Sequence, residues 1–193
     1  MTLQPGACVE VAIGRLGAQG DGLARLGDVA VRVALALPGE RWRVRLVARR
    51  RDGWDAEPLE LLAPVERAAP FCGHYPICGG CRLQHLPPAA YLAHKRDRVA
   101  AALAQRGLRD TELLPVVSSP LASRRRLRLA WARTGPCVTL GLRQRRSRAL
   151  VDLVECPVAA APLVAEIAAL RRLLADHPEL GAAGEASLTS TDA

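Results

Sequence analysis

Three cysteines stand close together in the segment FCGHYPICGGCRLQH, at Cys72, Cys78 and Cys81. No other feature of the sequence limits the fold as strongly as this C-x5-C-x2-C spacing. The two glycines between the last pair let the backbone curl so that both sulfurs reach one centre, as a thiolate-bound metal or cluster requires. The segment therefore predicts a metal site that ties this loop to another part of the chain.

The fourth ligand must be Cys8, Cys137 or Cys156. We favour Cys156, in VDLVECPV, because it follows a strand and precedes a proline, as ferredoxin-type cluster ligands do. The other two are expected to be buried and to serve as small apolar residues. Spacing alone fits Zn(Cys)4 as well as a [4Fe-4S] cluster, and a zinc site that uses His74 or His85 is a further alternative.

The apolar runs are too short for a membrane span, and the start MTLQPGACVE lacks the layout of a signal peptide. We therefore expect a cytoplasmic protein without a membrane partner. In that reducing compartment, clustered thiols are metal ligands or catalytic groups rather than disulfides.

Positive charge is concentrated in one segment. The net charge is +8, and 26 of the 27 basic residues are arginine, a bias that GC-rich coding alone can produce. Residues 1–66 are neutral, whereas residues 123–148 hold nine arginines and no acid. Because this segment contains no acid to balance them, we expect the arginines to face phosphates; the alternative is a solvated face balanced by acids from elsewhere in the fold.

Apolar residues alternate on both sides of a Thr134-Gly135-Pro136 turn in this segment, which predicts two antiparallel strands with one apolar and one basic face. The predicted RNA-binding residues are Arg124, Arg125, Arg126, Arg128, Arg143, Arg145, Arg146 and Arg148.

The first sixty residues contain short alternating runs separated by glycine turns, which indicate a small antiparallel β-barrel. The stretches GRLGAQGDGLARLGDVAVRV and ALPGERWRVRLV resemble the TRAM domain, an OB-like barrel that delivers RNA-modifying enzymes to RNA. A generic barrel with an unknown partner is the alternative. Helical spacing predicts one helix from Pro87-Pro88 to Gly107 and a second from Pro162 to Ala175.

Taken together, C-x5-CGGC-x2-QH, the helix YLAHKRDRVAAALAQRG, the arginine-rich strand and LGLRQRRSRALVDLVECPV resemble the N-terminal half of the bacterial 23S rRNA (uracil-5-)-methyltransferase family, over about residues 9–180. The resemblance implies that Cys72, Cys78, Cys81 and Cys156 hold a [4Fe-4S] cluster rather than zinc. It also implies S-adenosylmethionine as methyl donor, and RNA as partner, with rRNA favoured and tRNA as the competitor.

In that family a C-terminal Rossmann-like domain carries out methyl transfer, with a cysteine that adds to C6 of uracil and a general base. We expect this domain to be absent from the chain, which offers no glycine-rich turn for the cofactor. No catalytic residue is assigned, and Cys137 is not taken as the nucleophile.

The sequence thus predicts a monomeric α+β protein with three parts: a TRAM-like OB barrel (1–62), a cysteine loop with a helix (63–122), and a basic hairpin with the fourth cysteine and a helix (123–193). The leading hypothesis is the RNA-binding and iron-sulfur part of a methyltransferase. A stand-alone RNA-binding module is the main alternative, and a zinc-ribbon-like protein that binds another protein is a weaker one.

Overall fold

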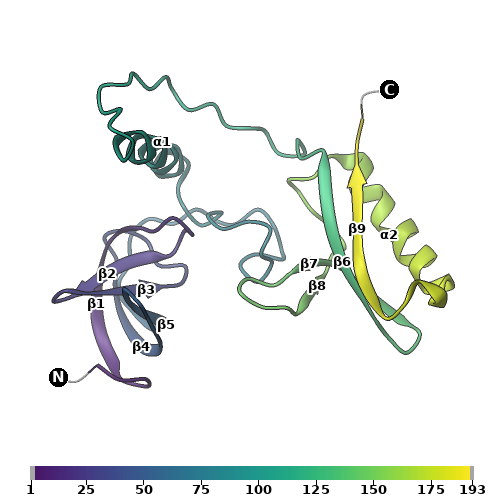
Figure 1. Ribbon diagram of the computed structural model, residues 1–193, viewed down its shortest axis with the longest axis horizontal. Helices are drawn as coiled ribbons and strands as arrows, with labels where there is room; N and C mark the ends of the chain where they lie inside the picture. The colour runs from purple at the N-terminus through teal and green to yellow at the C-terminus, as the bar shows by residue number, and fades with distance from the viewer. Residues whose placement is uncertain (1–2, 192–193) are drawn as a thin grey trace. The chain divides into compact units, whose positions relative to one another are not determined.

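The computed structural model describes residues 3–191, which contain a closed barrel, a second sheet and two α-helices (Figure 1). The elements are β1 (Cys8–Leu16), β2 (Gly22–Leu26), β3 (Val29–Val33), β4 (Arg41–Arg50), β5 (Gly53–Ala63), α1 (Pro88–Ala104), β6 (Arg126–Thr134), β7 (Cys137–Arg143), β8 (Leu150–Asp152), α2 (Ala161–Asp176), the 3-10 turn η1 (Pro178–Leu180) and β9 (Ala183–Thr189). The expected mixture of helix and strand is confirmed. No helix in this range has the length and apolar character needed to cross a membrane.

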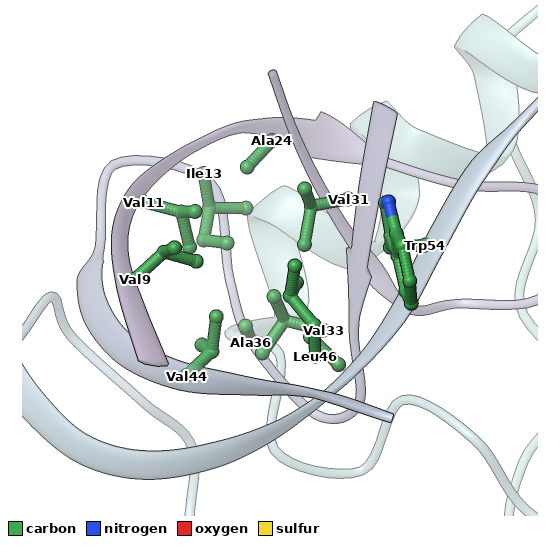
Figure 2. Close-up of a cluster of buried hydrophobic side chains, with 11 residues drawn as sticks. Val9, Val11, Ile13, Ala24, Val31, Val33, Ala36, Val44, Leu46 and Trp54 are labelled. Carbon is green, nitrogen blue, oxygen red and sulfur yellow. The ribbon is translucent and has the colours of Figure 1, made fainter. Parts of the chain in front are cut away.

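The barrel closes in the order β1-β2-β3-β5-β4, with β4 pairing back onto β1. All its pairings are antiparallel except that between β3 and β5. Val9, Val11 and Ile13 alternate along β1 with exposed residues, and Figure 2 shows them pointing inward with Val31 and Val33. Burial of one face of each alternating strand is what drives the barrel to close, and the barrel predicted from that alternation is confirmed.

A buried carboxylate fixes the turn that leads into β4. Glu40 has no exposed surface and accepts hydrogen bonds from the Leu37 amide at 2.7 Å and the Trp42 indole at 2.8 Å. Arg67, in the segment after β5, donates to both of its oxygens at 2.8 Å. The turn and the chain that leaves the barrel are therefore held by the same acid.

The second sheet has the order β8-β7-β6-β9 and is antiparallel throughout. Leu127, Leu129 and Trp131 of β6 form a core with Leu163 and Ile167 of α2, so α2 covers one face of the sheet (Figure 1). The predicted hairpin and both predicted helices are confirmed, although α1 has no buried residue.

The chain forms two compact units, which group residues differently from the three parts expected from the sequence. One unit contains residues 1–69 and 83–116, and the other contains residues 70–82 and 117–193. The cysteine loop thus belongs with the second sheet and not with α1. The reason is its backbone hydrogen bonding: the Gly79 amide donates to the Arg143 carbonyl, and the Arg145 amide donates to the Ile77 carbonyl, each at 2.9 Å.

Candidate cysteine site and nucleic-acid interface

The loop that carries three of the predicted ligands is shaped by backbone hydrogen bonds between residues close in sequence. The Tyr75 amide donates to the Cys72 carbonyl at 3.1 Å, and the Cys78 amide donates to the His74 carbonyl at 2.9 Å. The Gly80 amide points at the Cys78 sulfur from 3.4 Å. The sulfur of Cys78 therefore lies inside a tight turn, where a backbone N–H stabilises its negative charge when it is a thiolate.

Gly79 and Gly80 allow this turn to lie against the end of β7. A Cβ on Gly79 would stand 2.8 Å from the Arg143 carbonyl oxygen, and a Cβ on Gly80 would stand 2.8 Å from the Leu142 side chain. Cys78 also forms a β-bridge with Gln144. Gly79 is needed for close approach to the backbone of β7, whereas at Gly80 the nearest atom is a terminal methyl of a flexible side chain; the sequence pattern pointed only to curling of the loop.

The fourth predicted ligand lies in the same environment. Cys156 is 8% exposed, as is Cys78, and the preceding Glu155 accepts a hydrogen bond from the Gly73 amide at 3.3 Å. This contact joins two segments that are 82 residues apart. It places the chain around Cys156 beside the loop that begins at Cys72.

Electrostatics links all four thiols. Burial raises the pKa of the Cys78 thiol; the Gly80 N–H opposes this rise, and charges on Cys81, Cys72 and Cys156 add to it. Negative charges that repel one another in this way favour a shared cation or a metal cluster. All four thiols are free of disulfides.

As a set of donors, these four thiols fit a centre with four thiolate ligands. Within residues 3–191, however, no three His, Cys, Asp or Glu side chains are placed to hold one metal ion. The two remaining cysteines, Cys8 and Cys137, are exposed. The expectation that they are buried was wrong: both lie at strand starts, with side chains on the outer face.

The predicted RNA-binding arginines separate into two groups. Arg125, Arg126, Arg128, Arg143, Arg146 and Arg148 are exposed. Arg124 and Arg145 are half-buried, and the Arg124 guanidinium lies 3.5 Å from the Gly80 carbonyl oxygen, where it donates a hydrogen bond. Arg124 therefore supports the cysteine turn, while Arg126 and Arg128 lie on the outward face of β6 and alternate with the buried Leu127 and Leu129.

Residues 123–148 contain no acid, and for two of these arginines the structure fits the alternative of an acid from elsewhere in the fold. Glu185 of β9 accepts a hydrogen bond from Arg128 and lies 3.8 Å from the guanidinium of Arg143. It is 57 residues from Arg128 in sequence, and β9 reaches β6 only through the antiparallel pairing of the sheet. No local pattern could have identified it.

Charge on the barrel, by contrast, is internally balanced. Arg41, Arg43 and Arg45 alternate along the outer face of β4, and each lies within 3.4 Å of a carboxylate of Glu10, Glu57 or Glu60. Exposed pairs of this kind stabilise the fold by less than about 1 kcal/mol each, but they neutralise the surface. Of the net charge of +8, the unit with the second sheet carries +5 and the other unit carries +3, and this face of the barrel adds little to either.

A cavity of about 840 Å³ lies between the β1–β2 turn of the barrel and α1. Its lining is mostly small and apolar, and its charged residues balance, with Arg15 and Arg98 against Glu66 and Asp97. Burial lowers the pKa of His94 in its wall, and the positive charges of Arg98 and Lys95 lower it further. The balance of charge does not favour a phosphate-bearing ligand there.

Comparison with known proteins identifies relatives that are named RNA methyltransferases. No family model matches the chain. It is 43% identical over 189 residues to a protein of Caulobacter vibrioides named as an uncharacterized RNA methyltransferase, covering 94% of this chain and 44% of that protein. It is 35% identical over 186 residues to the 23S rRNA (uracil(1939)-C(5))-methyltransferase RlmD of Vibrio cholerae, covering 94% of this chain and 42% of that one.

Among solved structures, the Pyrococcus abyssi tRNA (uracil-54, C5)-methyltransferase in complex with S-adenosyl-L-homocysteine matches with a TM-score of 0.58 and 25% identity. The match covers 87% of this chain and 37% of that structure. The chain thus spans less than half the length of the relatives it matches. Over nearly all of its own length, it is homologous to part of proteins named RNA methyltransferases, among them enzymes that methylate C5 of uracil in 23S rRNA.

Proposed function

We propose that these residues form the RNA-binding and iron-sulfur part of an S-adenosylmethionine-dependent RNA (uracil-C5)-methyltransferase that acts on rRNA. The observation that carries the proposal is the similarity over 94% of the chain to a 23S rRNA (uracil(1939)-C(5))-methyltransferase. The exposed arginines on one face of the second sheet supply a surface suited to phosphates.

In this proposal Cys72, Cys78, Cys81 and Cys156 hold a [4Fe-4S] cluster. When bound, the cluster supplies four metal–thiolate bonds that cross-link the loop to the segment after β8. Zinc on the same thiolates is the alternative. The support from the structure is the Glu155–Gly73 hydrogen bond, which joins the two cysteine segments, and the raised pKa of the Cys78 thiol, to which burial contributes most and the other three thiols add. Iron and acid-labile sulfide in anaerobically purified protein would favour the cluster, and a colourless zinc protein would exclude it.

The described residues do not themselves fit S-adenosylmethionine. Both sheets are antiparallel apart from the β3–β5 pair, and residues 3–191 contain no parallel strand–turn–helix unit that binds such a cofactor. In this proposal methyl transfer is carried out by residues other than these. In this proposal the described residues bind RNA through guanidinium groups on a rigid sheet.

The identity of the RNA is the second element of the proposal. The relatives named for 23S rRNA are 35% identical to the chain, and the solved structure of a tRNA methyltransferase is 25% identical, so rRNA is favoured and tRNA is the competitor. Titration of the full chain with a labelled 23S rRNA fragment and with tRNA tests this directly. Tighter binding to the rRNA fragment at equal salt is expected; preference for tRNA would reverse the assignment, and failure to bind either RNA would refute it.

A further inference from the structure

One carboxylate lies between two guanidinium groups on the exposed face of the second sheet. Glu185 of β9 accepts a hydrogen bond from Arg128 of β6 through one oxygen, and its other oxygen lies 3.8 Å from the guanidinium of Arg143 on β7. The three residues come from three different strands. Two guanidinium groups that converge on one small anion are the arrangement by which arginines bind phosphate.

The convergence of two positive charges shows why an anion is needed at this point. The β6–β7 register ends at Ala130 and Gly141, and beyond it the Arg143 carbonyl accepts a hydrogen bond from the Gly79 amide, so Arg128 and Arg143 meet only through their side chains at Glu185. Two guanidinium groups that lie close together repel one another. Glu185 pairs with Ala130 on the other side of β6, one step along the ladder, and its side chain relieves this repulsion.

The three side chains of this bridge are accessible to solvent. Arg128 keeps 76% of its side-chain surface exposed, Arg143 keeps 51% and Glu185 keeps 41%. The neighbouring row is formed by Ala130 and Gly141, which are buried and carry little or no side chain. Helix α2 packs on the opposite face, against Leu129 and its neighbours. A phosphodiester can therefore reach both arginines without displacing any part of the core.

We propose that Arg128 and Arg143 form a binding site for one RNA phosphate, which the Glu185 carboxylate occupies in the free protein and vacates when RNA binds. The inference rests on the proposed RNA-binding function and deepens it, because it names the two arginines that share a phosphate and the acid that competes with it. In this role Glu185 limits the affinity of the surface for polyanions. An exposed ion pair is weak enough for a phosphate to replace it.

The test compares the full wild-type chain with Glu185→Gln in titrations of a fluorescein-labelled oligouridylate, followed by anisotropy. Loss of the competing carboxylate is expected to tighten binding about two- to fivefold, the factor that corresponds to an exposed ion pair. Glu166→Gln is the matched control: it removes the same charge from the exposed surface of α2 and should give no comparable gain. Circular dichroism establishes that each variant is folded, and Glu185→Thr, which suits a strand, repeats the measurement.

Combining Glu185→Gln with arginine substitutions distinguishes this proposal from a general effect of charge. The gain from Glu185→Gln should persist with Arg126→Gln, because Arg126 lies beyond the bridge, and vanish when Arg128 and Arg143 are both changed to Gln. An equal gain without those two arginines, or RNA binding by wild type that Glu185→Gln leaves unchanged, would overturn the inference alone. A wild-type chain that binds no RNA would instead refute the proposed function.

Discussion

Replacement of the buried acid Glu40 by glutamine is expected to destabilise the barrel by about 3 kcal/mol. Glu40 accepts four hydrogen bonds, one from the Leu37 amide, one from the Trp42 indole and two from Arg67. Removal of one partner of a buried ion pair costs about 3 to 5 kcal/mol. Because the Arg67 side chain is 31% exposed and water can take up part of its charge, we place the cost at the lower end of that range.

The matched control is Glu57→Gln. Glu57 pairs with Arg45 at 2.6 Å, but 52% of its side chain is exposed, so its loss should cost less than about 1 kcal/mol. Amide hydrogen exchange of the full chain, followed by NMR, measures the free energy of opening of the barrel strands separately from that of the second sheet. A cost for Glu40→Gln no larger than for Glu57→Gln would refute the reasoning.

The same carboxylate makes the barrel sensitive to acid. Burial opposes ionisation of Glu40, but hydrogen bonds from Arg67, Leu37 and Trp42 outweigh it and hold its pKa below the ordinary value of 4.5. The unfolded chain therefore binds this proton more readily than the folded chain does. The stabilisation should be complete above pH 4.5 and be lost as the pH falls through the folded-state pKa, and Glu40→Gln should abolish that part of the acid dependence.

Three further predictions concern the sheet unit. Cys78→Ser should abolish iron binding in anaerobically purified protein, whereas Cys137→Ser, an exposed cysteine outside the site, should leave the iron content unchanged; equal iron in both variants would contradict the ligand assignment. Arg126→Gln should reduce the slope of log affinity for single-stranded RNA against log salt by about 0.7, the value for one phosphate contact, and an unchanged slope would remove Arg126 from the interface. Gly141→Ala would place a Cβ 2.0 Å from the Val151 carbonyl oxygen and should cost about 1 to 3 kcal/mol in urea unfolding, whereas Gly14→Ala, with its nearest neighbour at 3.8 Å, should cost less than half as much.

The fold was largely predictable because its signals are local. Val9, Val11 and Ile13 alternate with exposed residues, and this period is enough to define a strand with one buried face. The same period on both sides of the Gly135-Pro136 turn predicted the β6–β7 hairpin. Helix α2 was predicted because its apolar residues recur at helical spacing. These features depend on neighbours a few residues apart, and the sequence contains them in full.

The candidate site was only partly predictable because its contacts are long-range. The three cysteines of the loop were identified by their spacing, and Cys156 by the proline that follows it, although their role as ligands stays a prediction. The supporting role of Arg124 beneath Gly80 was not foreseen, and the arginine was grouped with the RNA-binding residues. Nothing in the run of arginines distinguishes one that faces solvent from one that holds a turn.

By itself, the sequence determined the barrel, the hairpin, the two helices and the concentration of positive charge in residues 123–148. Only the tertiary structure decided which unit the cysteine loop joins and which acid lies among the arginines. The physical reason is that hydrophobic periodicity is a property of neighbouring residues, whereas an ion pair depends on which strands lie side by side. Nothing in the sequence around Glu185 links it to the arginines. It reaches Arg128 and Arg143 because β9 pairs with β6.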